Sequence, residues 1–359
     1  MSQPRSKRIA AGTLDVMSRR GVIRCLVAAV LFGASAPAAS RLAGDMPTLV
    51  LAGLLYLGAA LAVLPVVVRR RPTSAGLRSG WRLLAIAVAF GGAIGPALMV
   101  AGLSRAPAAT VSLLLNFELV ATIFIAAVFF REQLGRRLLS AVALIAGAGV
   151  ILVLQPGVGF DIGGLFVVGA CICWGIDNSI TARIDQLSPE QVTFVKGAFA
   201  GMFNLVLGLV LVSHVDITAR QIVAALVIGA LGYGLSITLW VKGARDLGAA
   251  RGQVLFATAP FIGAIVSWTF LGESISAVQL IAVPLAAAGV ALSLRTSHEH
   301  THQHEVMAHE HEHDHSDDIH HQDHSHPDAF VGRHSHRHAH GEIAHAHSHV
   351  PNLHHHHQH

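Results

Sequence analysis

The sequence predicts an all-α integral membrane protein in which ten transmembrane helices form two inverted repeats of five. Hydrophobic residues make up 53% of the 359 residues and charged residues 13%, which is about half the charged share of a soluble domain. Apolar runs recur through residues 21–295, and each is long enough to cross about 30 Å of hydrocarbon. One run, 109–132 (ATVSLLLNFELVATIFIAAVFFRE), has a counterpart 141 residues later, 250–273 (ARGQVLFATAPFIGAIVSWTFLGE), and both end on glutamate.

The repeat length defines the expected domains. A period near 141 residues is too long for a solenoid unit but suits a duplicated helical membrane bundle. The expected parts are an N-terminal arm (1–20), repeat 1 (21–155), repeat 2 (162–295) and a C-terminal tail (296–359).

The arm is polar and basic, and we expect it in the cytoplasm. Its end, Ser18-Arg19-Arg20 before an apolar run, is similar to a twin-arginine or Sec signal peptide. Because the run around Phe32-Gly33 matches a later one around Trp174-Gly175 and many spans follow, we interpret it as a retained first helix.

The ten expected spans are joined by short connections, which favours antiparallel neighbours. These spans are 21–40, 48–68, 81–103, 109–130, 138–155, 162–182, 191–213, 220–241, 251–271 and 276–295. Alternate loops, with the N-terminal arm counted in the first set, hold 18 and 3 Lys or Arg residues, so the positive-inside rule places both termini in the cytoplasm. Because each repeat has an odd number of spans, the second repeat enters the membrane in the opposite orientation. This is the inverted-repeat plan of secondary transporters, with a substrate site near the midplane between the halves.

Several short patterns carry a family resemblance. They are Leu31-Phe32-Gly33-Ala34-Ser35, its counterpart Cys173-Trp174-Gly175-Ile176-Asp177-Asn178, and the helix ends at Glu132 and Glu273. Together they resemble the EamA-type transporters of the drug/metabolite transporter superfamily over residues 21–295. The resemblance implies a ten-helix carrier that moves small organic metabolites, often outward. One position departs: Pro260 fits the usual proline of the family, but its repeat-1 counterpart is Leu119, preceded by Glu118.

Two carboxylates are candidates for the transport chemistry. Glu118 and Asp177 lie within expected spans, where a charged side chain costs about 2.5–3.5 kcal/mol on insertion scales. Asn178 is next to Asp177, and Thr181 is one turn further on the same face. Either carboxylate could take up a coupling proton or bind a cationic group of the substrate; the alternative is a structural clamp between helices, hydrogen-bonded to Asn116, Asn204 or a backbone carbonyl.

Charged residues near span ends are interpreted differently. Glu132 and Glu273 are expected to cap a helix or to pair with Arg131 or Arg136 in preference to binding substrate. Lys196, like Arg24, is expected to extend to the interface as an anchor.

Glycines interrupt two further spans. The segment Gly91-Gly92-Ala93-Ile94-Gly95-Pro96 is echoed by Gly232-Tyr233-Gly234. We expect both segments to weaken or break their helices where they meet protein or a water-filled cavity. Close helix packing through Gly91 and Gly95 is an equally good alternative, and Trp174, Tyr233 and Trp240 could line a cavity or pack against neighbours.

The tail changes the composition completely, because 24 of the 25 histidines follow residue 295. With few apolar residues, the tail is expected to be disordered. Its imidazoles could bind Zn²⁺, Ni²⁺, Co²⁺ or Cu²⁺. The candidate ligands are His298, His300, His302, His304, His309, His311, His313, His315, His334, His336, His338 and His340.

These observations favour a secondary carrier of the cell membrane that moves a small molecule and requires no cofactor. The alternatives are a nickel, cobalt or zinc carrier whose tail collects its cargo, and a membrane-anchored metal buffer or sensor. An enzyme is not expected, because the spans hold no nucleophile–base set, phosphate loop or cofactor motif. Cys25, Cys171 and Cys173 are interpreted as small buried residues. The lipid bilayer and transition-metal ions are the other expected partners, nucleic acid is not, and a homodimer is left open.

Overall fold

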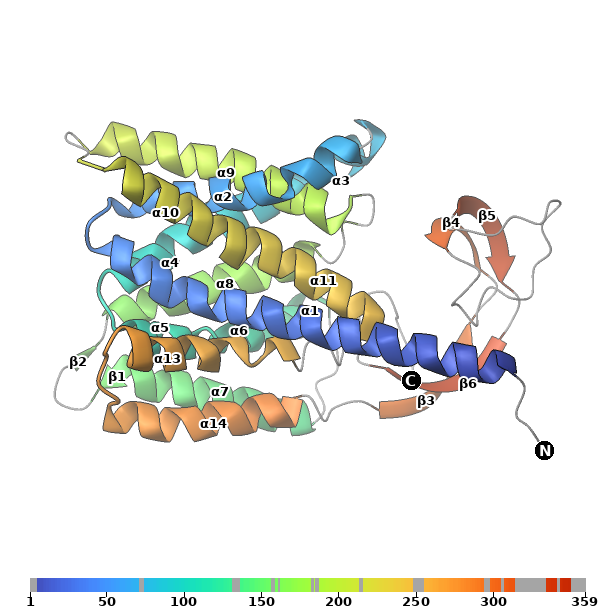
Figure 1. Ribbon diagram of the computed structural model, residues 1–359. Helices are drawn as coiled ribbons and strands as arrows, with labels where there is room; N and C mark the ends of the chain where they lie inside the picture. Colours follow the sequence, from blue (N-terminus) through green and yellow to red (C-terminus); the bar gives the residue numbers. More distant parts are fainter. Residues whose placement is uncertain are drawn as a thin grey trace. The chain divides into compact units, whose positions relative to one another are not determined.

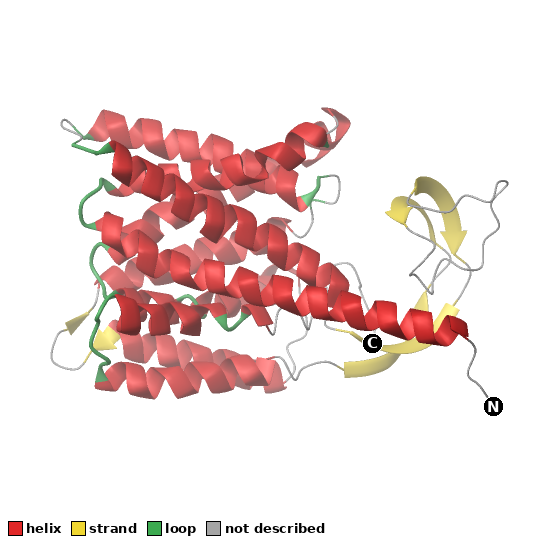
Figure 2. Ribbon diagram, viewed as in Figure 1, coloured by secondary structure: helices red, strands yellow, loops and turns green. Residues whose placement is uncertain are grey.

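A computed structural model of the chain describes residues 5–70, 74–130, 136–155, 159–160, 162–181, 184, 187–212, 216–247, 255–293, 298–304, 307–313, 334–340 and 343–349. It contains two compact units, Met1–Thr296 with Asn352–His359, and Ser297–Pro351. In the first unit the described structure is almost entirely helical (Figures 1 and 2).

The helices of the first repeat are α1 (Arg5–Ala43), α2 (Thr48–Arg69), α3 (Ser74–Ala87), η1 (Val88–Ile94), α4 (Gly95–Leu103), α5 (Ala108–Leu114), α6 (Phe117–Phe130) and α7 (Arg136–Val153). Those of the second are α8 (Ile162–Thr181), α9 (Pro189–Leu211), α10 (Ala219–Gly229), η2 (Ala230–Leu235), α11 (Ser236–Leu247), α13 (Ala259–Phe270) and α14 (Ala277–Ser293). A short hairpin, β1 (Leu154–Gln155) and β2 (Gly159–Phe160), connects the repeats. We call the end of the bundle that carries this hairpin the hairpin end. The opposite end, to which the set of loops rich in Lys and Arg belongs, is called the basic end.

The prediction of an all-α membrane fold is confirmed. Within the described residues, seven helices are long and apolar enough to cross a membrane: Arg19–Ala43, Thr48–Arg69, Gly80–Leu103, Ala108–Ile125, Ile162–Thr181, Pro189–Leu211 and Ala219–Gly243. Three shorter apolar helices, Leu138–Val153, Ala259–Phe270 and Ala277–Ser293, occupy the remaining expected spans. The chain is a multi-pass membrane protein.

Equivalent helices make equivalent contacts in the two repeats. α2 packs against its counterpart α9, and α7 against its counterpart α14. α1 packs on α13 and α11, while its counterpart α8 packs on α6 and α4. This exchange of partners is what a pseudo-twofold relation between two inverted repeats requires.

Small residues let these helices approach closely. A Cβ atom added to Gly201 of α9 would lie 2.8 Å from the backbone nitrogen of Leu57 and 2.9 Å from the carbonyl oxygen of Gly53, both in α2. Close backbone approach of this kind provides the van der Waals contact that holds helices together in lipid, where the hydrophobic effect does not.

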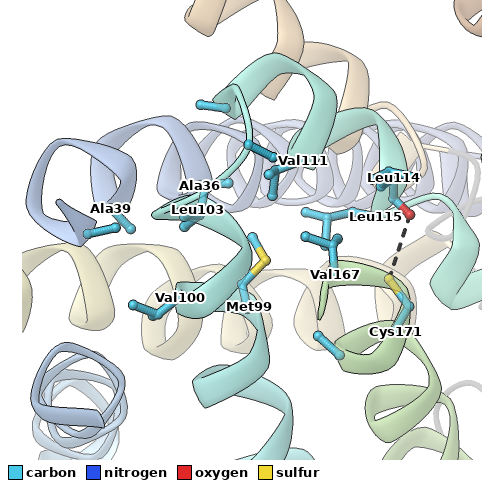
Figure 3. Close-up of a cluster of buried hydrophobic side chains, with 14 of the residues drawn as sticks. Ala36, Ala39, Met99, Val100, Leu103, Val111, Leu114, Leu115, Val167 and Cys171 are labelled. Carbon is cyan, nitrogen blue, oxygen red and sulfur yellow. Dashed lines mark hydrogen bonds between the residues drawn. The ribbon is translucent and has the colours of Figure 1, made fainter. Parts of the chain in front are cut away.

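The core lies between the repeats and is built mainly from aliphatic side chains. Figure 3 shows Met99 and Val100 of α4, Val111 and Leu114 of α5, and Val167 of α8 packed together. Because α5 ends at Leu114, the carbonyl oxygen of Leu114 is available to a donor outside the helix. The Cys171 thiol donates to this oxygen at 3.6 Å. The prediction that the three cysteines are small buried residues is confirmed.

Large apolar side chains cover the outside of the bundle. On α9, Phe199, Phe203 and Val210 are 68%, 59% and 75% exposed. Such a surface suits hydrocarbon chains of a bilayer, so lipid is the medium that surrounds the helices.

The second unit forms two antiparallel strand pairs. β3 (His298–His304) pairs with β6 (Ile343–His349), and β4 (Met307–His313) pairs with β5 (His334–His340). This differs from the expectation that the tail lacks regular structure. A tail with few apolar residues cannot form a packed core, but a two-stranded ribbon does not need one. The alternation of histidine with other residues has the period of two that a β-strand repeats.

Candidate functional site

The third and eighth spans are interrupted by π-helical segments at matching positions. η1 and η2 contain Gly91 and Gly232, which are 141 residues apart. The expected weakening of both helices is therefore confirmed, although each segment widens into a π-helix and does not break. A π-helical segment leaves carbonyl groups without their usual i→i+4 donors, and such segments are frequent at functional sites.

Side chains from neighbouring helices bind these carbonyl groups. The carbonyl oxygen of Gly91 accepts hydrogen bonds from Tyr56 Oη at 2.5 Å and from Trp174 Nε1 at 3.2 Å. Asn204 Nδ2 donates to the carbonyl oxygen of Ala93 at 3.0 Å. Three helices, α2, α8 and α9, thus converge on η1, which places this segment at the centre of a polar region.

Asp177 projects from α8 onto this segment and forms a buried ion pair. Lys196 Nζ of α9 lies 2.5 Å from Asp177 Oδ2, and the side chains are 16% and 6% exposed. Thr181 Oγ1 donates to Asp177 Oδ1 at 3.0 Å. A Cβ atom at Gly91 would lie 2.2 Å from the Asp177 carboxyl carbon, so glycine at this position makes room for the carboxylate.

The expectation that Lys196 is an interface anchor is wrong. Lys196 is the eighth residue of α9, which begins at Pro189, and its ammonium group turns inward to Asp177. The sequence held a signal that could have suggested this, since a lysine two turns inside a span is rare and usually finds a partner.

Glu118 lies at a break in the fourth span. α5 ends at Leu114 and α6 begins at Phe117, although a single span was expected here. Asn116 Nδ2 donates to the carbonyl oxygen of Leu113 at 2.9 Å and stabilises the turn between the two helices. Glu118 therefore occupies the first turn of α6, where the positive end of the helix dipole favours a carboxylate.

Glu118 is bound by neutral groups. Asn178 Nδ2 donates to Glu118 Oε1 at 2.7 Å. Within the described part of the chain no cationic side chain pairs with Glu118, although Asp177 and Lys196 are near enough to act on it electrostatically. Among these residues, Asp177 is paired with a cation and Glu118 is not.

Asn178 is exposed on a polar side of α8. The exposed apolar residues of α8, Ile162, Leu165 and Ile172, point to the surface that faces lipid. At about 100° per residue, Asn178 lies about 120° or more from each of them around the helix. The exposed Asn178 therefore does not share the lipid-facing side of α8.

The symmetry-related position around η2 is uncharged and aromatic. There a Cβ atom at Gly232 would meet Ser35 Cβ at 2.4 Å, as Gly91 meets Asp177. Tyr233 contacts Phe32 with ring centroids 6.0 Å apart and Tyr56 at 5.8 Å. Among the described residues that contact η1 and η2, the charged side chains Asp177 and Lys196 are thus on the η1 side.

This aromatic cluster continues through Phe256 to Trp240. Phe256 lies 5.3 Å from Phe32 and 5.6 Å from Trp240, measured between ring centroids. The Trp240 Nε1 atom is buried and finds no acceptor among the described residues. A buried N–H without a partner is costly, so this donor is available to a polar atom of a bound solute.

The predicted site residues are therefore distributed over two neighbouring regions. One group surrounds η1, and we call it the charged region: Asp177, Asn178, Thr181, Glu118 and Gly91. Tyr233 belongs to the aromatic cluster. Gly95 serves packing, since a Cβ atom there would lie 2.9 Å from Trp174 Nε1, and Asn116 serves the helix break. Tyr56 and Lys196 were missed as site residues.

The described side chains of the bundle offer no metal site. Among them, no group of three or more His, Cys, Asp or Glu residues converges in a way that could hold a metal ion. The predicted tail histidines lie in strands β3, β4 and β5, apart from His315, which is outside the described residues.

Comparison with known proteins identifies the family. The model of the EamA-like transporter family matches residues 19–155 and again residues 161–295. The chain belongs to the EamA-like transporter family. Both matches together span most of the bundle, and they coincide with the two repeats that the structure relates by a pseudo-twofold.

Two individual proteins are similar to this chain, and the solved structure among them shows a similar fold. An uncharacterized transporter of Methanothermobacter thermautotrophicus is 23% identical over 290 residues, which are 75% of this chain and 84% of that protein. One solved crystal structure of a protein superimposes with a TM-score of 0.55 at 18% identity, covering 76% of this chain and 96% of the other. The EamA-like chain is a membrane transporter, and the prediction that it is not an enzyme is confirmed by its family.

Proposed function

We propose that this EamA-like protein is a secondary carrier that moves a small organic molecule by alternating access of its two inverted repeats. The observation that supports this most directly is the group of Glu118, Asn178, Asp177 and Lys196 between the repeats. Charged groups inside a membrane are expensive and mark ion and substrate pathways. A position between inverted repeats is where such a pathway is expected.

The two carboxylates have different proposed roles. Asp177 is neutralised by Lys196, and breaking this pair would leave a buried charge, so Asp177 holds the geometry of the region. Among the described residues, the side-chain donor to Glu118 is the neutral amide of Asn178, so a proton or a cationic group of the substrate could neutralise the charge of Glu118. We therefore assign coupling to Glu118.

The aromatic cluster supports an organic substrate. Phe32, Tyr233 and Phe256 offer flat apolar surfaces, and Trp240 Nε1 offers an unused hydrogen-bond donor. Binding sites for small molecules combine such apolar walls with a few polar groups that fix orientation.

A reconstituted transport assay tests this function. Proteoliposomes carrying the full chain, with a panel of radiolabelled small metabolites, should show flux driven by a pH gradient for at least one compound. Glu118→Gln should abolish the pH dependence of the flux. Normal pH-driven flux in both Glu118→Gln and Asp177→Asn would exclude both carboxylates from coupling.

We also propose that the chain resides in the cell membrane with its basic end and both termini in the cytoplasm. Alternate loops with the N-terminal arm differ by 18 to 3 in Lys and Arg, which supports this orientation through the positive-inside rule. Proteolysis of the tail in right-side-out and inverted vesicles tests it, and cleavage in right-side-out vesicles would contradict it.

For the tail we propose binding of divalent transition metals. In both strand pairs the register places histidine opposite histidine, and successive pairs are two residues apart. These pairs are His298–His349, His300–His347, His302–His345, His309–His338, His311–His336 and His313–His334. Imidazole nitrogens are suitable ligands for zinc, nickel, cobalt and copper.

The role of the bound metal can be decided by comparing three proteins in cells: the full chain, a chain truncated after Arg295, and Asp177→Asn. If truncation alone changes metal tolerance and metal content, the tail acts as a buffer. If both changes alter metal content, metal is the cargo. If neither does, the organic-substrate carrier is supported.

A further inference from the structure

Glu273 joins the two repeats at the hairpin end of the bundle. It follows α13, and its oxygens accept hydrogen bonds from the first two backbone N–H groups of α5. Glu273 Oε1 lies 2.8 Å from Ala108 N, and Glu273 Oε2 lies 2.9 Å from Ala109 N. The prediction that Glu273 caps a helix is confirmed, but the capped helix belongs to the other repeat.

The local backbone directs the carboxylate to this position. Gly272 has a φ of 71°, a left-handed conformation that glycine adopts without strain and that often ends a helix. Both carboxylate oxygens are used, and the first turn of a helix carries positive partial charge. The contact is therefore a pair of charge-assisted hydrogen bonds.

A second set of contacts ties the same turn to α14. Gln279 Nε2 donates to Thr110 Oγ1 at 3.0 Å, and Gln279 Oε1 accepts from Trp268 Nε1 at 3.2 Å. Gln279 and Thr110 are 3% and 1% exposed. The first turn of α5 is thus closed against α13 and α14 at the hairpin end.

The contacts of Glu273 and Gln279 with α5 lie toward the hairpin end, whereas Asn178, the exposed residue of the charged region, lies toward the basic end. Along the chain, Ala108, Ala109 and Thr110 lie between the hairpin end and Glu118, whereas Asn178 is exposed and lies three residues before Thr181, the last residue of α8. The contacts of Glu273 and Gln279 therefore lie on the hairpin side of Glu118, and the exposed Asn178 lies toward the basic end.

We propose that Glu273 is the latch of the gate at the hairpin end, a role that rests on the proposed carrier function. For the pathway to open at that end, α5 must separate from α13 and α14, and both hydrogen bonds of Glu273 must break. The bonds hold this gate shut while the charged region is accessible from the basic end. The sequence counterpart, Glu132, lies outside the described residues.

A thiol reporter behind the latch tests the proposal. Ser112 is one turn further into α5, is 1% exposed, and lies against Gly263 of α13. Full chains carrying Ser112→Cys would be labelled with a membrane-impermeant maleimide added on the side that the hairpin end faces. We expect Glu273→Gln to raise the labelling rate at least tenfold, because an amide supplies one acceptor oxygen where the carboxylate supplies two.

Matched variants separate a latch from a static cap. Asp216→Asn removes an exposed acidic residue near the same end and should leave the labelling rate unchanged. If Glu273→Gln does not accumulate in the membrane, Glu273→Asp, whose shorter side chain cannot reach both nitrogens, should give the same increase. Unchanged labelling in a folded Glu273 variant would show a static cap and overturn the proposal.

The same proteins distinguish this proposal from the carrier function. If Glu118→Gln abolishes pH-driven flux while Glu273→Gln leaves labelling unchanged, the carrier stands and the latch is wrong. If Glu273→Gln increases labelling but the unmodified chain shows no flux with any compound, the gate contact stands without the carrier function.

Discussion

At the scale of single residues, the charged region depends on one ion pair and one glycine. Asp177 and Lys196 come from different helices and are both largely buried, and Gly91 provides the space between η1 and α8. An insertion cost of about 2.5–3.5 kcal/mol for each isolated charge explains why the two groups meet and do not face lipid.

The ion pair predicts strongly coupled substitutions. Asp177→Asn or Lys196→Met alone leaves a buried charge without its partner and should lower the free energy of unfolding by about 3–5 kcal/mol. The double variant should lose less free energy of unfolding than the sum of the two single losses, and the difference should exceed about 1 kcal/mol. Denaturation in mixed micelles measures this, and additive losses would show that the pair contributes no coupling.

Gly91→Ala should disturb the same region sterically. The new Cβ atom would lie 2.2–2.6 Å from the Asp177 carboxyl group, so the carboxylate must move away from Lys196. We expect a loss of about 1–3 kcal/mol of stability. Gly147→Ala is the control, because nothing lies within 4 Å of its added Cβ atom, and replacing glycine inside a helix by alanine there should stabilise by about 0.5–1 kcal/mol.

At the scale of helices, the interruptions determine which groups reach the centre. The break between α5 and α6 gives Glu118 a helix N-terminus, and the π-helical turn in η1 presents the Gly91 carbonyl group to Tyr56 and Trp174. Pro260 is the second residue of the matching helix α13. The break in repeat 1 contains no proline, and the Asn116 side chain stabilises its turn.

The contact between α2 and α9 should be sensitive to a single methyl group. Gly201→Ala would place a Cβ atom 2.8 Å from the backbone nitrogen of Leu57, and backbone atoms cannot rotate away as side chains can. The two helices must separate, so we expect about 1–3 kcal/mol of destabilisation. Thermal unfolding in detergent measures the effect, with Gly147→Ala as the control. Equal unfolding midpoints for the two variants would contradict the prediction.

At the scale of the whole molecule, a helical transporter unit and a histidine-rich unit share one chain. Metal binding by the second unit should depend on pH, because imidazole binds metal only when neutral. Because an ordinary histidine has a pKa of about 6.5, the affinity for metal should be retained at neutral pH and should fall as the pH drops below about 6.

Isothermal titration of the full chain with zinc at several pH values measures this dependence. The chain truncated after Arg295 is the control and should bind little zinc at any pH. Affinity that does not change between pH 7.5 and pH 5 would indicate that ligands other than histidine hold the metal.

The sequence alone determined the membrane class, the duplication and the span count. These depend on apolar run length and on a 141-residue repeat, which are properties of the chain that need no knowledge of contacts. It also identified Glu118, Asp177 and Asn178, because a polar group within an apolar run must find a partner.

Only the tertiary structure decided which groups are partners. Lys196 is paired with Asp177 from another helix, Glu273 caps a helix of the opposite repeat, and Tyr56 binds η1 from 35 residues away in sequence. A helical period shows which side chains share a face, but it does not show which faces of different helices meet. That choice is made by packing, where glycines such as Gly91 and Gly201 allow close approach at some places and larger residues prevent it at others.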